Sequence, residues 1–299
     1  MLGVAQSLPV MAANTFFEDY RTDWLEFPIY RDRVRPVLIS SGEDTDVNSV
    51  SMTDLFAPYD QQTILLAVNT IQTDSTTPTT PTITGGATTW VQVASTAYDV
   101  TGSVRGKLTL FRTQANQDSF FDAGAVIDYA AVTQDATMFQ AYLLDGEDRS
   151  GTNGSAAIVQ NATGTAASDA DCTASLASFG NAKNATMAFV AILDETTDPV
   201  PIFDSVDWND WYSQSLGYGG IAFSILVPVH THANQTAPSM SFTSNALASG
   251  MIAVELKKDL INPSADCGEF AASGYGGYVP AGLSNYLVTP TQLEYRFQT

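Results

Sequence analysis

The sequence predicts an all-β protein, an antiparallel β-sandwich with an internal pseudo-repeat, flanked by extended arms at both ends. Of its 299 residues, 44% are apolar and only 15% are charged, and much of the remainder is Ser, Thr, Gly and Asn. This composition suits strands with one apolar face and one uncharged polar face. Short apolar runs alternate with joints rich in Gly, Asn, Asp and Thr, and no 3.6-residue period extends over a long window.

The first segment, residues 1–35, is predicted to be an N-terminal arm. It is rich in aromatic and arginine side chains, a composition typical of interfaces. We interpret it as a contact to a neighbouring molecule, and the alternative is an arm that packs on its own domain. The candidate interface residues are Phe16, Phe17, Tyr20, Trp24, Arg31, Arg33 and Arg35.

The sandwich itself is predicted for residues 36–258. Residues 107–112 alternate between polar and apolar side chains, and apolar runs at 63–68, 187–193 and 221–227 are typical of buried strands. The two halves, about 61–145 and 185–258, share one order. Each has an apolar strand, a loop, a Trp-bearing strand, a Gly-led strand and two more strands. We expect residues 146–184, rich in Ala, Ser, Thr, Gly and Asn, to be a linker.

The last segment, residues 259–299, is predicted to be a C-terminal arm. Pro263 lacks the N–H that a strand needs, so the last strand ends before it. The Gly-rich, aromatic stretch that follows has no periodicity and indicates an extended segment. It lies either on a neighbour or on its own sandwich. The candidate interface residues are Tyr275, Tyr278, Tyr286, Tyr295 and Phe297.

The charge balance excludes some partners. The formal net charge is −20. Nucleic acid and anionic membranes are therefore not expected as partners, because both require clusters of Lys and Arg. No apolar stretch reaches the ~18 residues of a membrane-spanning helix, and the N-terminus lacks the basic start of a signal peptide. Cys172 and Cys267 form no metal-binding motif. We expect free thiols, and the alternative is a disulfide between the two.

Candidate catalytic patterns are scarce, and we expect no enzyme activity. His230 and His232 share a strand face without an evident third metal ligand. The sequence has neither a GxSxG nucleophile motif nor a phosphate-binding GK[ST] loop. The acids Asp204, Asp207 and Asp210 fit an acidic loop better than a glycosidase pair.

Two binding sites remain as hypotheses. A sugar could stack on the aromatic residues Trp208, Trp211, Tyr212 and Tyr218. No cofactor is predicted. A structural Ca²⁺ ion is a candidate, because the loop at 145–148, together with Ser150, Thr152 and Asn153, offers oxygen atoms that could bind it.

Several segments resemble, in order, a β-sandwich module of tailed-phage structural proteins. They are the opening strand at 61–68, the segment Gly86 to Trp90, the strand at 107–112, the segment Trp208 to Trp211, and the closing strand at 251–256. The resemblance implies a jelly-roll-like sandwich, a virion location and no catalytic residues. It leads us to expect a capsid decoration, turret or tail component that contacts other virion proteins and copies of itself. The alternative is a carbohydrate-binding or host-adhesion module, on a virion or cell surface, with host glycans as partners.

Overall fold

Antiparallel strands form nearly all of the structure. In the computed structural model, every pair of neighbouring strands is antiparallel, and the part of the chain that can be described contains one short 3₁₀ segment, η2 (Thr152–Ala157). The predicted all-β, antiparallel sandwich is thereby confirmed. The described residues are 34–53, 55, 61–74, 76–86, 88–100, 104–115, 124–167, 171–194, 201–203, 209–210, 214–218, 221–231, 235–242 and 246–259.

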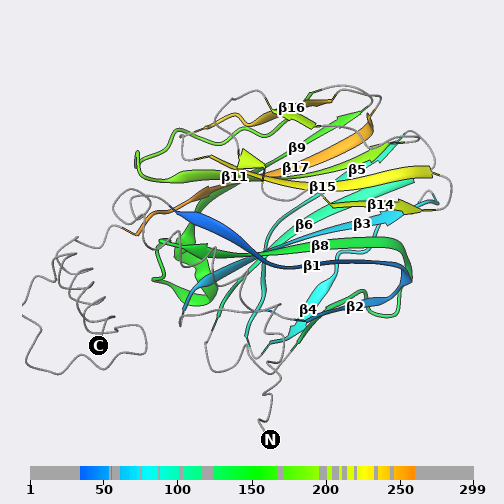
Figure 1. The fold of residues 1–299 in the computed structure, drawn as a ribbon, viewed down its shortest axis with the longest axis horizontal. Coiled ribbons are helices and arrows are strands. Elements are labelled where there is room, and N and C mark those ends of the chain that lie inside the picture. Colours follow the sequence, from blue (N-terminus) through cyan, green and yellow to red (C-terminus); the bar gives the residue numbers. More distant parts are fainter. Residues whose placement is uncertain are drawn as a thin grey trace, which may run out of the picture. The chain divides into compact units, whose positions relative to one another are not determined.

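Two large sheets form the centre of the molecule (Figure 1). The first large sheet has the order β1 (Arg35–Val47), β8 (Gln134–Asp145), β3 (Thr63–Gln72), β6 (Val104–Gln114) and β5 (Val91–Val100). The second has the order β13 (Asn209–Asp210), β15 (Ile221–Thr231), β11 (Ala185–Asp194), β17 (Ala246–Leu256) and β9 (Ile158–Ala167), with β14 (Gln214–Tyr218) also paired to β15.

Two small sheets cover the outer faces of the large ones. The first small sheet contains β2 (Ser49–Met52), β7 (Ala125–Asp128) and β4 (Thr82–Gly85). The second contains β10 (Cys172–Thr173), β16 (Ser239–Phe242) and β12 (Pro201–Phe203). Each small sheet and its large neighbour enclose an apolar core, and a third core lies between the two large sheets.

The central strand of each large sheet is buried on both faces. In β3, Leu65 and Ala67 point into the core between the large sheets, whereas Leu66 points toward the first small sheet. In β11, Phe189 points into the shared core and Val190 toward the second small sheet. A strand covered on both sides needs apolar residues at every position, which explains the continuous apolar runs in the sequence.

Tyr98 of β5 ties the two large sheets together. Its hydroxyl donates a hydrogen bond to Oδ1 of Asn69 at 2.6 Å. Its ring lies over Gly106 of the neighbouring strand and against Gly250 of the second large sheet, where a Cβ would lie 2.6 Å from a ring carbon. Glycine at these two positions therefore lets the ring fit between the sheets.

The two large sheets follow the same strand order when each is read along the chain. Strands β1, β8, β3, β6 and β5 of the first correspond to β9, β17, β11, β15 and β13–β14 of the second. The small sheets correspond in the same way, because β2-β7-β4 matches β10-β16-β12. The correspondence is one of pairing order.

Two segment boundaries differ from the sequence-based expectations. Arg35, assigned to the N-terminal arm, begins β1 and pairs with Asp145. Residues 146–184, expected as a linker, contain η2, β9 and β10. The strand β9 has no clear pattern in the sequence, because it lies at a sheet edge. There it partly buries small residues such as Ala162 and Ala166 and exposes the residues between them.

Candidate functional site

Both ends of the described chain meet at one end of the sheets. Arg35 pairs with Asp145, and two residues later Glu147 forms an isolated bridge with Lys258. Figure 1 shows the blue start of β1 and the orange end of β17 on the same side. Arg35 and Lys258, near the two ends of the described chain, therefore lie close together. We call residues 145–157, with the strand ends that they contact, the junction.

The junction turn is fixed to the first large sheet by backbone geometry and hydrogen bonds. Gly151, Asn153 and Gly154 have positive φ angles of 92°, 53° and 71°, a region that favours glycine and asparagine. A Cβ at Gly154 would lie 2.7 Å from the methyl carbon of Thr63. Arg112 donates through Nε to the carbonyl of Asn153 at 3.2 Å. The turn thus packs directly on the ends of β3 and β6.

Glu147 is the most unusual group in the junction, because its carboxyl is almost fully buried. Its Oε1 accepts a hydrogen bond from the backbone N–H of Thr63 at 2.9 Å and lies 3.5 Å from Nε of Arg149. Its Oε2 is buried without a hydrogen-bond partner among the described residues. Burial raises the pKa of Glu147 to about 7, although Arg149 and the hydrogen bond from Thr63 oppose the shift.

A second buried carboxylate, Glu255 of β17, is hydrogen-bonded through both oxygens. Asn184 donates to Oε1 and Gln160 donates to Oε2, both at 2.6 Å. The orientation of each amide is fixed, because the Asn184 oxygen accepts from the N–H of Lys258 and the Gln160 oxygen from that of Ala177. This network holds the last described residues of the chain against β9 and β11.

Protein donors contact the acidic loop in which the sequence suggested a Ca²⁺ site. Asp148 forms a 2.6 Å ion pair with Lys257 and accepts hydrogen bonds from the backbone and side chain of Ser150. Burial alone would raise its pKa, but the bonds from Lys257 and Ser150 hold the pKa of Asp148 below its usual value. Asp145 lies 3.6 Å from Arg149. Among the described residues, no three His, Cys, Asp or Glu side chains could hold a metal ion together.

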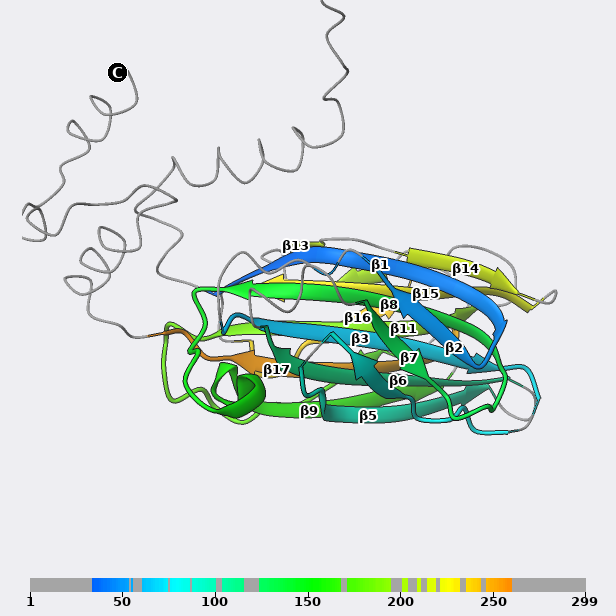
Figure 2. The ribbon, with the colours of Figure 1, turned by 90° about the horizontal axis from the view of Figure 1, so that it is seen from below.

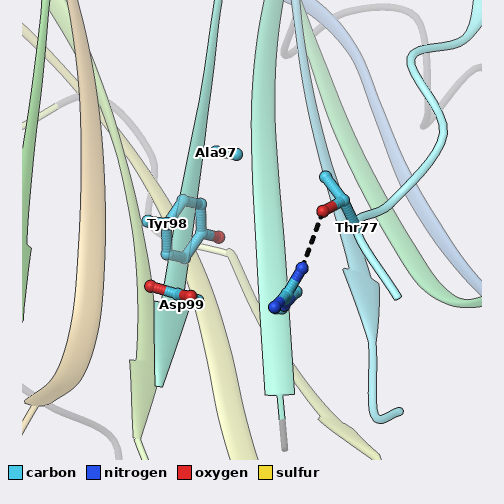
Figure 3. Close-up of a pocket in the computed structure, with 5 residues that line it drawn as sticks. Thr77, Ala97, Tyr98 and Asp99 are labelled. Atoms are coloured by element: carbon cyan, nitrogen blue, oxygen red, sulfur yellow. Dashed lines mark hydrogen bonds between the residues drawn. The ribbon is translucent and has the colours of Figure 1, made fainter. Parts of the chain in front are cut away.

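A small pocket of about 140 Å³ lies at the opposite end of the first large sheet. Its lining consists of Thr77, Ala97, Tyr98, Asp99 and Arg105 (Figure 3). The Arg105 guanidinium donates to the Thr77 hydroxyl at 2.9 Å. Typical ligand sites enclose roughly 300–1,000 Å³, so this pocket is too small to indicate a ligand.

Most site residues predicted from the sequence lie outside the described residues. This applies to the interface candidates in residues 1–33 and 260–299, to Trp208, Trp211 and Tyr212 of the sugar hypothesis, and to Asp204, Asp207 and His232. Tyr218 ends β14 and Asp210 ends β13, but only their backbones are described. His230 pairs with Met187 of β11. The structure therefore brings none of these groups together into a described site.

No helix within the described ranges has the length and apolar character needed to span a membrane. No protein-family model, curated protein or solved structure matches the chain.

Proposed function

We propose that the protein is a non-enzymatic structural component of a tailed-virus particle, either a capsid decoration or turret or a tail component. The observation that carries the proposal is the junction, where the first and the last described residues of the chain lie close together. Two anchors that start at one end of a rigid body attach that end and leave the rest facing outward. Two linked anchors also bind with higher avidity than either one alone.

The strand order supports a jelly-roll fold for each half. In the first half, strands 1, 8, 3 and 6 share one sheet and strands 2, 7 and 4 share the other, and the second half repeats this order. This order resembles that of a jelly roll, an architecture used by viral capsid and lectin domains, although β5 pairs with β6 in the first sheet and does not extend the sheet of β2, β7 and β4. Fold alone does not determine function, so the fold strengthens the proposal without carrying it.

The proposed partners are other virion proteins and further copies of the chain, and the proposed location is the virion. A net charge of −20 disfavours nucleic acid and anionic membranes as partners. Neither the junction nor the small pocket presents a nucleophile with a general base or an open pair of carboxylates. The proposed role is therefore to bind and to assemble.

The test uses particles that lack the protein and full-length variants added back to them. We expect Trp24→Ala combined with Tyr286→Ala to reduce the amount bound to particles by at least tenfold, because aromatic anchors dominate interface energies. Thr22→Ala combined with Thr289→Ala, in the same segments, is the matched control and should bind like the wild type. Equal binding of the aromatic variant and the control would contradict attachment through the terminal segments.

A further inference from the structure

Two edge strands of the large sheets, β5 and β9, lie along one flank of the molecule (Figure 2). In the described part of the chain, β5 pairs only with β6, and β9 pairs only with β17. Each therefore presents one row of backbone N–H and C=O groups without a strand partner. The two strands have equal length, ten residues each, and both run away from the junction.

This flank lacks the charges that normally prevent edge strands from pairing with other chains. The only charged residue of β5 is Asp99, near its far end, and β9 has none. The edge strand on the opposite flank differs sharply. There β1 carries Pro36 and the charged residues Arg35, Glu43, Asp44 and Asp46. The contrast occurs within one molecule, so it does not follow from the low overall charge content.

The side chains of β9 alternate between covered and exposed positions. One face is covered, because Gln160 exchanges hydrogen bonds with the backbone of Ala177 and Gly164 lies under the carbonyl of Thr173. The other face exposes Val159, Asn161, Thr163, Thr165 and Ala167. Val159 is 51% exposed and is one of two large apolar side chains exposed in the described residues. These side chains are short and mostly uncharged, so a second strand could approach the edge closely.

The charge of the chain limits where two copies could meet. Two copies, each with a net charge of −20, repel wherever carboxylates face one another. Along β5 and β9 this repulsion is weakest, and each copy supplies an edge of the same length and polarity as the other. We propose that this flank is a contact between two copies of the chain, formed by edge-to-edge strand pairing.

The direction of the strands selects the symmetry of this contact. Because β5 and β9 run in the same direction, a two-fold axis along the sheet-stacking direction places β9 against β9 and β5 against β5 of the second copy, antiparallel in both cases. The other two-fold arrangement would pair β9 with β5 in parallel, which is less stable per residue. The antiparallel contact would make both large sheets continuous across the dimer, in the closed symmetry that most homo-oligomers adopt.

Sedimentation velocity of the full chain over a range of concentrations and salt tests the proposal. We expect a reversible dimer that strengthens as salt screens the acidic copies. Thr163→Lys should raise the dissociation constant at least tenfold by placing like charges at the pairing edge. The matched control is Ser41→Lys on the edge strand β1. Both substitutions reduce the net negative charge equally, so general electrostatics would make both variants associate more tightly.

Hydrogen exchange of the wild-type protein gives a second measurement that needs no variant. Amides of residues 94–100 and 160–167 should gain protection with increasing concentration, whereas those of β1 should not. A wild type that stays monomeric at all concentrations and salts would overturn the proposal, as would equal effects of Thr163→Lys and Ser41→Lys. The dimer contact rests on the proposed function in one respect, the expectation that copies of the chain assemble with one another. The dimer contact and the attachment to particles can be tested separately. If the aromatic-segment variant loses attachment and Thr163→Lys keeps it, attachment does not depend on the dimer contact.

Discussion

Replacing Glu147 with Gln removes the charge from a carboxyl that the junction buries. The folded protein raises the pKa of this group from 4.5 to about 7. At ~1.4 kcal/mol per pKa unit, ionised Glu147 lowers the free energy of unfolding by about 3 kcal/mol. The glutamine side chain keeps the shape of the carboxyl, and its oxygen still accepts the hydrogen bond from Thr63. We therefore expect Glu147→Gln to stabilise the protein at alkaline pH.

The sign of the pH dependence follows from the raised pKa. Below about pH 4.5, Glu147 is protonated in both the folded and the unfolded protein and costs nothing. As the pH rises from about 4.5 to about 7, the unfolded chain releases this proton while the folded state keeps it, so stability is lost, and above about pH 7 the loss is complete. Charged groups close to Glu147 are Arg149, which favours ionisation, and Asp145, which opposes it. Burial outweighs both.

Urea unfolding at pH 5.5 and pH 8.0 measures the effect and avoids precipitation near the isoelectric point of about 4.1. Between these two pH values, the stability of Glu147→Gln relative to the wild type should increase by about 2 kcal/mol. Asp145→Asn is the control, because the Asp145 side chain is 44% exposed, and it should show no comparable change. The reasoning is refuted if the difference between Glu147→Gln and the wild type is the same at both pH values.

Two further substitutions test the packing of the sheets. Glu255→Gln should destabilise the protein by about 1–3 kcal/mol in urea unfolding, because its new amide donor would face the fixed donors of Asn184 and Gln160; an unchanged midpoint would contradict this network. Gly250→Ala should cost about 1–3 kcal/mol, because the added Cβ would lie 2.6 Å from a ring carbon of Tyr98. Gly180 has open space around it, so Gly180→Ala should leave the thermal midpoint nearly unchanged. Equal shifts in the two alanine variants would contradict the close packing of Tyr98 between the two large sheets.

The strands buried on two faces could be predicted from the sequence, and the edge strands β1 and β9 could not. Residues 63–72 and 185–194 form central strands whose apolar runs reflect cores on both sides. The strand β9 covers one face only in part and mostly with small side chains such as Ala162 and Ala166, so its composition resembles that of a loop. Arg35 was assigned to the arm because its neighbours before it are aromatic and basic. Its partner Asp145 is 110 positions away in the sequence, and no local pattern indicates that pairing.

The junction was only partly predictable for the same reason. The sequence places Asp145, Glu147 and Asp148 in one acidic loop, which predicts a solvated turn or, as the alternative, a Ca²⁺ site. It does not show that Thr63 and Lys257 supply the donors, because these residues are distant in the chain. Glu255 does carry a signal in the sequence, because it is a single acid within the apolar run 251–256. Such an acid is either exposed or buried with dedicated donors, and here it is buried.

Quantitative mass spectrometry of gradient-purified virus particles, from cultures that produce this chain, tests the central claim most directly. The proposed function predicts that peptides from residues 63–112 are present in the intact particles at a fixed ratio to the main shell protein. That ratio should be a symmetric copy number and should persist after a high-salt wash, because attachment depends on aromatic contacts. Complete, infectious particles without these peptides, while the chain is abundant in the same culture, would contradict the claim.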